Sequence, residues 1–115
     1  MIVYIGFSNK THKLYAKMLC NKYKHCAPVI IDKNRVVLYQ FVHTNKIIDI
    51  NIRKKDLNIL KHYGWTFIKY NVKNIPTDIL KIHAITCVAF SKRVCRINNI
   101  LIQTPDALFR YLSDK

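Results

Sequence analysis

Three consecutive segments with strand-like patterns and very short connections constrain the fold of this chain most strongly. Residues 25–32 and 35–43 are rich in apolar and β-branched side chains, and the Asp-Lys-Asn at 32–34 between them favours a hairpin turn. Residues 46–52 then alternate Ile with Asp and Asn, which is the pattern of a strand with one buried face. Because connections this short join antiparallel neighbours, the sequence predicts an antiparallel sheet.

The remaining segments predict helices packed on this sheet. Gly64 is a suitable residue for ending a helix, and Thr86 and Thr104 are suitable N-caps, the second followed by a Pro in the first turn. The expected elements are strands at 2–7 and 65–72, helices at 9–23, 54–63, 87–96 and 105–112, and a loop at 73–84 with one helical turn near 77–82. The predicted class is α+β, and a length of 115 residues suits one domain spanning residues 1–115.

Charge is the dominant bulk property, with 20 Lys and Arg against 6 Asp and Glu and a net charge of +14. Such a chain attracts polyanions, which include nucleic acid, acidic cell-wall polymers and acidic partner proteins. The alternative is that Lys is simply the default surface residue, because the cations are spread along the chain. No segment has the length of apolar sequence that a membrane span needs, and the N-terminus lacks the pattern of a signal peptide.

The chain has four cysteines, and their spacing does not predict a metal site. Cys20, Cys26, Cys87 and Cys95 include no C-x-x-C pair, and His83 precedes the helix that would have to present it together with Cys87. We therefore expect four reduced cysteines, no metal and no cofactor. Two Gly and three Pro also leave little room for a Gly-rich phosphate loop.

Cys87 has the position of a nucleophilic thiol. It is the first residue of the helix predicted at 87–96, and Phe90, Ser91 and Val94 share its face at helical spacing. Backbone N–H groups and the helix dipole favour an anion in the first turn, which lowers a thiol pKa, and the same N–H groups can stabilise an oxyanion. The alternative is a small buried apolar residue, the role of most free cysteines.

His25 is the candidate general base for this thiol. It begins the first hairpin strand, with the parity of Ala27 and Val29, and we expect this face to meet a helix docked on the sheet. The alternative is an exposed histidine at a strand end. Gln40 on the adjacent strand is the candidate for orienting the imidazole, and Asp49 is the second choice, although its parity places it outward.

Two segments resemble a known family. Residues 24–30 (Lys-His-Cys-Ala-Pro-Val-Ile) and residues 86–94 (Thr-Cys-Val-Ala-Phe-Ser-Lys-Arg-Val) resemble the circularly permuted papain-like group of the NlpC/P60 superfamily. That group includes lecithin:retinol acyltransferase-like enzymes and many small phage-encoded proteins that resemble peptidases, and its order is His strand, polar residue on the next strand, then Cys helix. Residues 104–112 also resemble the last helix of small tailed-phage proteins. The likeness covers roughly residues 24–40 and 86–112.

The resemblance implies a permuted papain-like domain in which Cys87 is the nucleophile, His25 the base and Gln40 the polar third residue. The phage proteins usually carry an acid at the third position. Gln40 can accept a hydrogen bond from an imidazole N–H but cannot stabilise the imidazolium by charge.

The expected function is that of a phage-encoded thiol hydrolase, a peptidase or amidase, that acts on cell-wall peptides as part of the virion or its tail. Its partners would be peptidoglycan or other virion proteins of the tail or internal core. It would be found in the phage particle, or in the host cytoplasm before assembly. One alternative is a weakly active or inactive virion structural protein with the same fold. Another is a basic nucleic-acid-binding module that contacts DNA through its positive surface.

Overall fold

The computed structural model describes residues 2–8, 25–33, 35–43, 46–84 and 86–114. Its centre is a five-stranded sheet with the order β4-β3-β2-β1-β5, in which every neighbouring pair is antiparallel. The strands are β1 (Ile2–Ser8), β2 (His25–Asp32), β3 (Arg35–His43), β4 (Lys46–Ile52) and β5 (Thr66–Asn71). The predicted hairpin is confirmed, and Lys33, which follows β2, has a positive φ of 52°.

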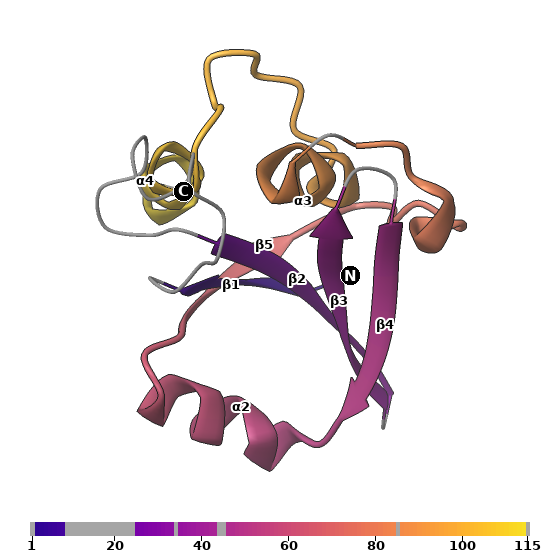
Figure 1. The fold of residues 1–115 in the computed structure, drawn as a ribbon, viewed down its shortest axis with the longest axis vertical. Helices are drawn as coiled ribbons and strands as arrows, with labels where there is room; N and C mark the ends of the chain where they lie inside the picture. Colours follow the sequence, from indigo (N-terminus) through magenta and orange to yellow (C-terminus); the bar gives the residue numbers. More distant parts are fainter. Residues whose placement is uncertain (1, 9–24, 34, 44–45, 85, 115) are drawn as a thin grey trace.

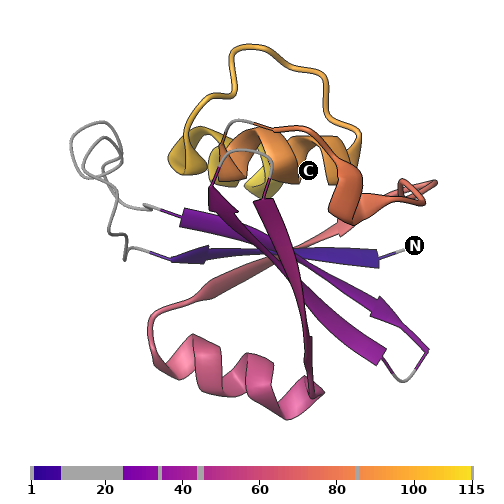
Figure 2. The same cartoon turned by 45° about the vertical axis from the view of Figure 1, so that its right-hand side comes forward.

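Helices lie on both faces of the sheet, so the predicted α+β architecture is confirmed (Figures 1 and 2). Helices α3 (Cys87–Cys95) and α4 (Pro105–Ser113) lie on one face, and α2 (Lys54–His62) lies on the other. A short 3-10 helix, η1 (Ile79–Lys81), supplies the turn predicted in the loop before α3. The helix predicted at residues 9–23 lies outside the described residues.

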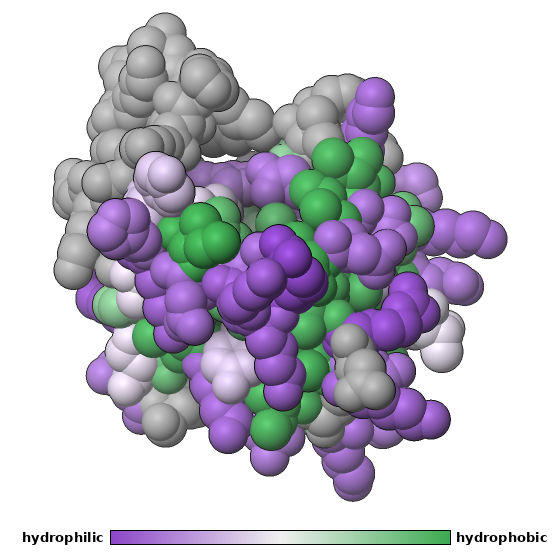
Figure 3. Space-filling view, turned by 90° about the horizontal axis from the view of Figure 1, so that it is seen from below, coloured by the Kyte–Doolittle hydropathy of each residue, from purple (hydrophilic) through white to green (hydrophobic). Residues whose placement is uncertain are grey.

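The two faces of the sheet differ in how much they bury. Most of the core lies under α3 and α4, where Val3, Ile5 and Phe7 of β1 are completely buried. The opposite face has a smaller cluster centred on Ala27 and Val29, and α2 contributes no buried residue to it. The side of the molecule seen from below shows apolar side chains among hydrophilic ones (Figure 3).

Strand β4 is more exposed than its alternating sequence predicted. Ile48 and Ile50 have the expected shared face, but their exposed fractions are 41% and 38%. The reason is that β4 is an edge strand and α2 does not extend its apolar cover over these two side chains. Alternation predicts which residues share a face, whereas burial depends on what packs against that face.

The predicted helix caps are confirmed in α3 and α4. Thr86 Oγ1 accepts a hydrogen bond from the Ala89 N–H at 3.0 Å, and Thr104 Oγ1 accepts one from the Ala107 N–H at 3.1 Å. These caps fix where each helix begins and how it enters the core. In α3 the predicted inward face, from Cys87 to Val94, is buried.

Candidate active site

The candidate site lies where β2 and β3 move apart. Residue pairs between these strands run from Asp32↔Arg35 to Val29↔Leu38, whereas β2 stays paired with β1 as far as Ser8↔His25. The strands diverge from their shared turn, and α3 lies over the opened end (Figure 1). The first residues of β2 can therefore contact side chains from both α3 and β3.

The predicted orientation of His25 is wrong in one respect. Its parity with Ala27 and Val29 was expected to direct it toward the helix that carries Cys87, but those two residues pack in the cluster on the α2 face. Cys26, the next residue, is the one that faces α3. His25 still reaches Cys87 because it is the first residue of β2, at the end where β3 no longer covers the strand.

Cys87 is the first residue of α3 and is 9% exposed. Its pKa is held well below the ordinary thiol value, first by a hydrogen bond from the Cys26 thiol and then by a hydrogen bond from His25 and the charge of its ring. The backbone N–H of Cys26 also donates to the sulfur, while burial acts in the opposite direction. Contacts that favour the anion outweigh the desolvation cost, and the Cys87 thiol therefore ionises more readily than an ordinary cysteine.

Gln40 completes the row of contacting side chains. Its Nε2 lies 2.7 Å from Nε2 of His25, so the side-chain amide and the imidazole are within hydrogen-bond distance. The structure thus brings together Cys87, His25 and Gln40, the three residues that the sequence singled out.

Two further residues of the site were missed by sequence reasoning. Cys26 is completely buried, and its Sγ lies 3.5 Å from Ser91 Oγ, one helical turn after Cys87. Burial and the neighbouring Cys87 raise the pKa of the Cys26 thiol well above its ordinary value, so it stays protonated and can donate to Cys87. Two features of the sequence could have indicated Cys26. Cys87 and Ser91 are four residues apart and therefore share one face of α3, and Cys26 directly follows His25 on the strand expected to meet that face.

The aromatic support of His25 was also missed. The ring of Trp65 meets the imidazole edge-on, with centroids 6.1 Å apart and an interplanar angle of 85°. Phe67 stacks on Trp65 with centroids 6.0 Å apart, and both rings lie over Gly6 of β1. This stack closes the side of His25 that faces away from α3.

Asp49 and the other described histidines do not join this group. Asp49, the second choice for orienting His25, pairs with Tyr39 across β3 and β4 and is exposed. His83 is exposed, and His62 lies against Tyr63 at the end of α2. His12 and the side chain of His43 lie outside the described part of the chain.

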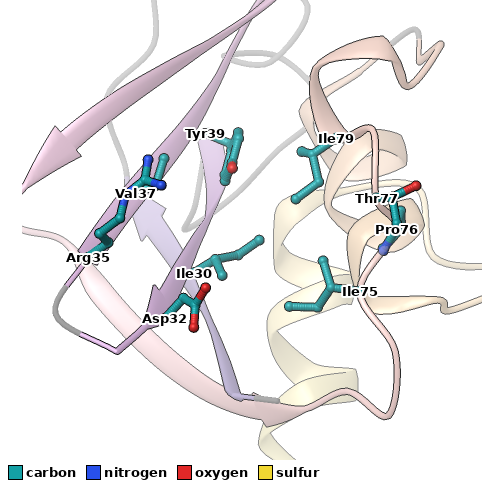
Figure 4. A pocket seen from close by; sticks show the side chains of 9 residues that line it. All are labelled: Ile30, Asp32, Arg35, Val37, Tyr39, Ile75, Pro76, Thr77 and Ile79. Atoms are coloured by element: carbon teal, nitrogen blue, oxygen red, sulfur yellow. The ribbon is translucent and has the colours of Figure 1, made fainter.

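A pocket of about 360 Å³ is present elsewhere, at the turn end of β2 and β3 (Figure 4). Asp32, Arg35 and Tyr39 line it from the sheet, and the segment from Ile75 to Ile79 closes it from the other side. Since His25 is at the opposite end of β2, this pocket does not surround the Cys87 sulfur.

Within the described residues, no group of three or more His, Cys, Asp or Glu is arranged to hold a metal ion. Cys26, Cys87 and Cys95 are free thiols, and Cys20 lies outside the described residues. The helices that the structure describes are all too short or too polar to cross a membrane. Comparison with known proteins identified no matching family model, no matching curated protein and no matching solved structure.

Proposed function

We propose that this protein is a thiol hydrolase that cleaves amide bonds, with Cys87 as nucleophile, His25 as general base and acid, and Gln40 as the positioning residue. The observation that carries the proposal is that Gln40 contacts His25, and that His25 lowers the pKa of Cys87 at the N-terminus of a buried helix. A nucleophile, a base and a group that orients the base form the minimal apparatus of acyl transfer.

The chemistry follows from these contacts. The Cys87 thiolate attacks the carbonyl carbon, and the oxyanion that forms is stabilised by the N–H groups of Cys87 and Val88, which have no partner within the helix. His25, as an imidazolium, gives a proton to the leaving amine and becomes neutral, while the C–N bond breaks to leave a thioester on Cys87. His25 then takes a proton from water, whose hydroxyl oxygen displaces the sulfur and releases the acid.

Gln40 suits both protonation states of His25. When Nε2 carries no proton, the amide N–H of Gln40 can donate to it across the 2.7 Å separation. When Nε2 is protonated, as it is in the imidazolium, the amide can rotate to present its oxygen as the acceptor. Gln40 therefore keeps the ring oriented through the cycle, although it supplies no negative charge.

The family and substrate belong to the same proposal. We propose a permuted papain-like domain related to the NlpC/P60 superfamily, because the His strand, the strand of the third residue and the Cys helix follow one another in that order. On the same resemblance, the protein acts on cell-wall peptides and belongs to a phage tail or virion. A net charge of +14 supports a substrate embedded in anionic cell-wall polymer.

A second candidate function is a structural virion protein that keeps the fold without turnover. The observation that favours it is the burial of Cys87, since a residue that is only 9% exposed offers little surface to a peptide carbonyl. The two functions differ in one measurable property, which is the reactivity of the Cys87 thiol in the folded chain.

The test is the pH dependence of alkylation by iodoacetamide, followed peptide by peptide. Trypsin places Cys20, Cys26, Cys87 and Cys95 on different peptides, residues 18–22, 25–33, 82–92 and 94–96. The proposal expects rapid labelling of peptide 82–92 at neutral pH, with peptides 25–33 and 94–96 protected in the folded protein. Protected or slow labelling of Cys87 at neutral pH, equal to that of Cys95, would contradict it and favour the structural role.

Turnover is tested with purified peptidoglycan, by measuring the release of new amino groups. Wild-type protein is expected to release them, and Cys87→Ser and His25→Ala are expected to abolish release. Cys95→Ala is the matched control, because it removes a buried thiol from the same helix without touching His25. Release by the Cys87→Ser variant at the wild-type rate would rule out the proposed mechanism.

A further inference from the structure

The contact between Cys26 and Cys87 has no role in the hydrolytic cycle beyond holding the thiolate. Cys26 is on β2 and Cys87 on α3, and both belong to the same core cluster where the helix docks on the strand. Ser91 Oγ lies 3.5 Å from Cys26 Sγ and belongs to the same helix face as Cys87. Two free thiols from different elements are thus neighbours inside the core.

We infer that Cys26 and Cys87 form an oxidation site, at which a hydroperoxide converts the two thiols into a disulfide that reversibly disables the nucleophile. The inference rests on the proposed role of Cys87 in hydrolysis, and it adds Cys26 as the resolving thiol. Cys26 directly follows His25 on β2. The strand that supplies the base for Cys87 therefore also supplies the thiol with which Cys87 can form a disulfide.

The two thiols differ in the way that such a reaction requires. Cys87 has its pKa lowered and reacts as the thiolate, which is the species that peroxides oxidise. Cys26 has its pKa raised, first by burial and then by its hydrogen bond to Cys87 and the charge of that sulfur. Once Cys87 is oxidised to the uncharged sulfenic acid, the last two influences disappear and Cys26 loses its proton more readily.

The reaction balances with the hydroperoxide as the only co-reactant. The Cys87 thiolate displaces one oxygen of H₂O₂, forming an S–O bond and releasing hydroxide, which takes up a proton to become water. The Cys26 sulfur then attacks the Cys87 sulfenic acid, the S–S bond forms, and the S–O oxygen leaves as a second molecule of water. Two thiols and one H₂O₂ therefore give one disulfide and two molecules of water.

Cys95 supplies an internal comparison. It is also buried on α3, but it is further along the helix than Ser91, and burial raises its pKa to about 12. Burial is the cause of this shift, and His25, which lowers the pKa of Cys87, does not lower that of Cys95. We expect it to remain a thiol under the same treatment.

The experiment treats the reduced full-length chain with H₂O₂ and maps the unreduced tryptic digest by mass spectrometry. The expected result is a cross-link between peptides 25–33 and 82–92, lacking two hydrogens relative to their sum, together with loss of iodoacetamide labelling at Cys87. Dithiothreitol should restore both peptides and the labelling. In Cys26→Ala the expected product is Cys87 sulfinic acid, which dithiothreitol does not reverse.

Each outcome has a distinct meaning. Oxidation of Cys87 to sulfinic acid in the wild-type chain, with Cys26 still a thiol, would overturn the inference while leaving the reactive thiolate and the proposed hydrolase intact. A cross-link in a chain whose hydrolysis is unaffected by Cys87→Ser would support Cys26 and Cys87 as an oxidation site, but it would overturn both the proposed function and the control of hydrolysis by this site. Cross-linking to Cys95 instead of Cys26 would overturn it as well. The wild-type map is decisive even where Cys26→Ala fails to fold.

Discussion

Gln40 and His25 meet at 2.7 Å although their strands are not paired at that point. Their contact is made by side chains across the opening between β2 and β3, and no ladder hydrogen bond holds the two residues in register. The amide is thus the direct link that fixes the imidazole relative to β3. An orienting residue in such a position should affect the rate of the reaction more than the stability of the fold.

Gln40→Ala tests this link. The variant should lower kcat/KM on peptidoglycan by about 10- to 100-fold, because a small misplacement of a reacting group costs roughly this much. Its free energy of unfolding should change by only about 1 kcal/mol, since one partly buried hydrogen bond is lost. Both are measured on the same preparation, by amine release and by urea unfolding.

Gln40→Glu separates orientation from charge. The introduced carboxylate can orient the ring and also stabilises the imidazolium, so amine release should equal or exceed that of the wild type and extend over a wider pH range. Gln103→Ala, which removes an exposed glutamine beside the loop before α4, is the control and should have no effect. If Gln40→Glu were as impaired as Gln40→Ala, the positioning role would be contradicted.

The sequence predicted the parts of the site that depend on neighbouring residues. The cap at Thr86 and the i, i+3, i+4 spacing after Cys87 are local, and they determined the start of α3 and the face that it buries. Gln40 could be placed beside His25 because a hairpin with a short turn fixes which strand is adjacent.

The predictions about the site that were wrong or missing depend on packing between elements that are distant in the sequence. Alternation showed that His25 and Cys26 face opposite sides of the sheet, but it did not show on which side α3 would dock. It also did not show that β3 leaves β2 before His25, which is why a residue of the α2 face can reach a thiol on the other face. For the same reason, sequence reasoning assigned no role in the site to Cys26.

Gly6 should be intolerant of a side chain because of the ring stack that supports His25. A Cβ at this position would lie 2.7 Å from Cε1 of Phe67 and 2.9 Å from Cε3 of Trp65, so both rings must move. Gly6→Ala should therefore cost about 1–3 kcal/mol of unfolding free energy. Trp65 is the one tryptophan in the chain, and its fluorescence should report the displacement directly.

A double-mutant cycle identifies the cause. In a Phe67→Leu background the nearest ring is absent, and Gly6→Ala should cost less than it does in the wild-type chain. Strictly additive costs would show that the destabilisation has another origin.

Thr86 and Thr104 offer a matched pair of helix caps. Each side chain accepts one hydrogen bond from the backbone three residues later, so Thr86→Ala and Thr104→Ala should each cost about 1 kcal/mol in urea unfolding. Only Thr86→Ala should slow the alkylation of Cys87, because only that cap orders the N–H groups around the thiolate. Equal alkylation rates in the two variants would contradict a role for the helix end in activating Cys87.

Cys95 should make the fold sensitive to alkaline pH. Burial raises its pKa from an ordinary 9.0 to about 12, so below pH 9 the thiol is protonated in both the folded and the unfolded chain and contributes no pH dependence. Between pH 9 and pH 12 the Cys95 thiol ionises in the unfolded chain but not in the folded chain, and the unfolding free energy falls by up to about 1.4 kcal/mol per pH unit.

Cys95→Ala should be less stable than the wild type at pH 7 by about 1 kcal/mol, because it leaves a small cavity. Under reducing conditions the difference between the two proteins in urea unfolding should shrink as the pH rises above 9. Parallel stability curves of the two proteins would contradict the buried, protonated state of Cys95.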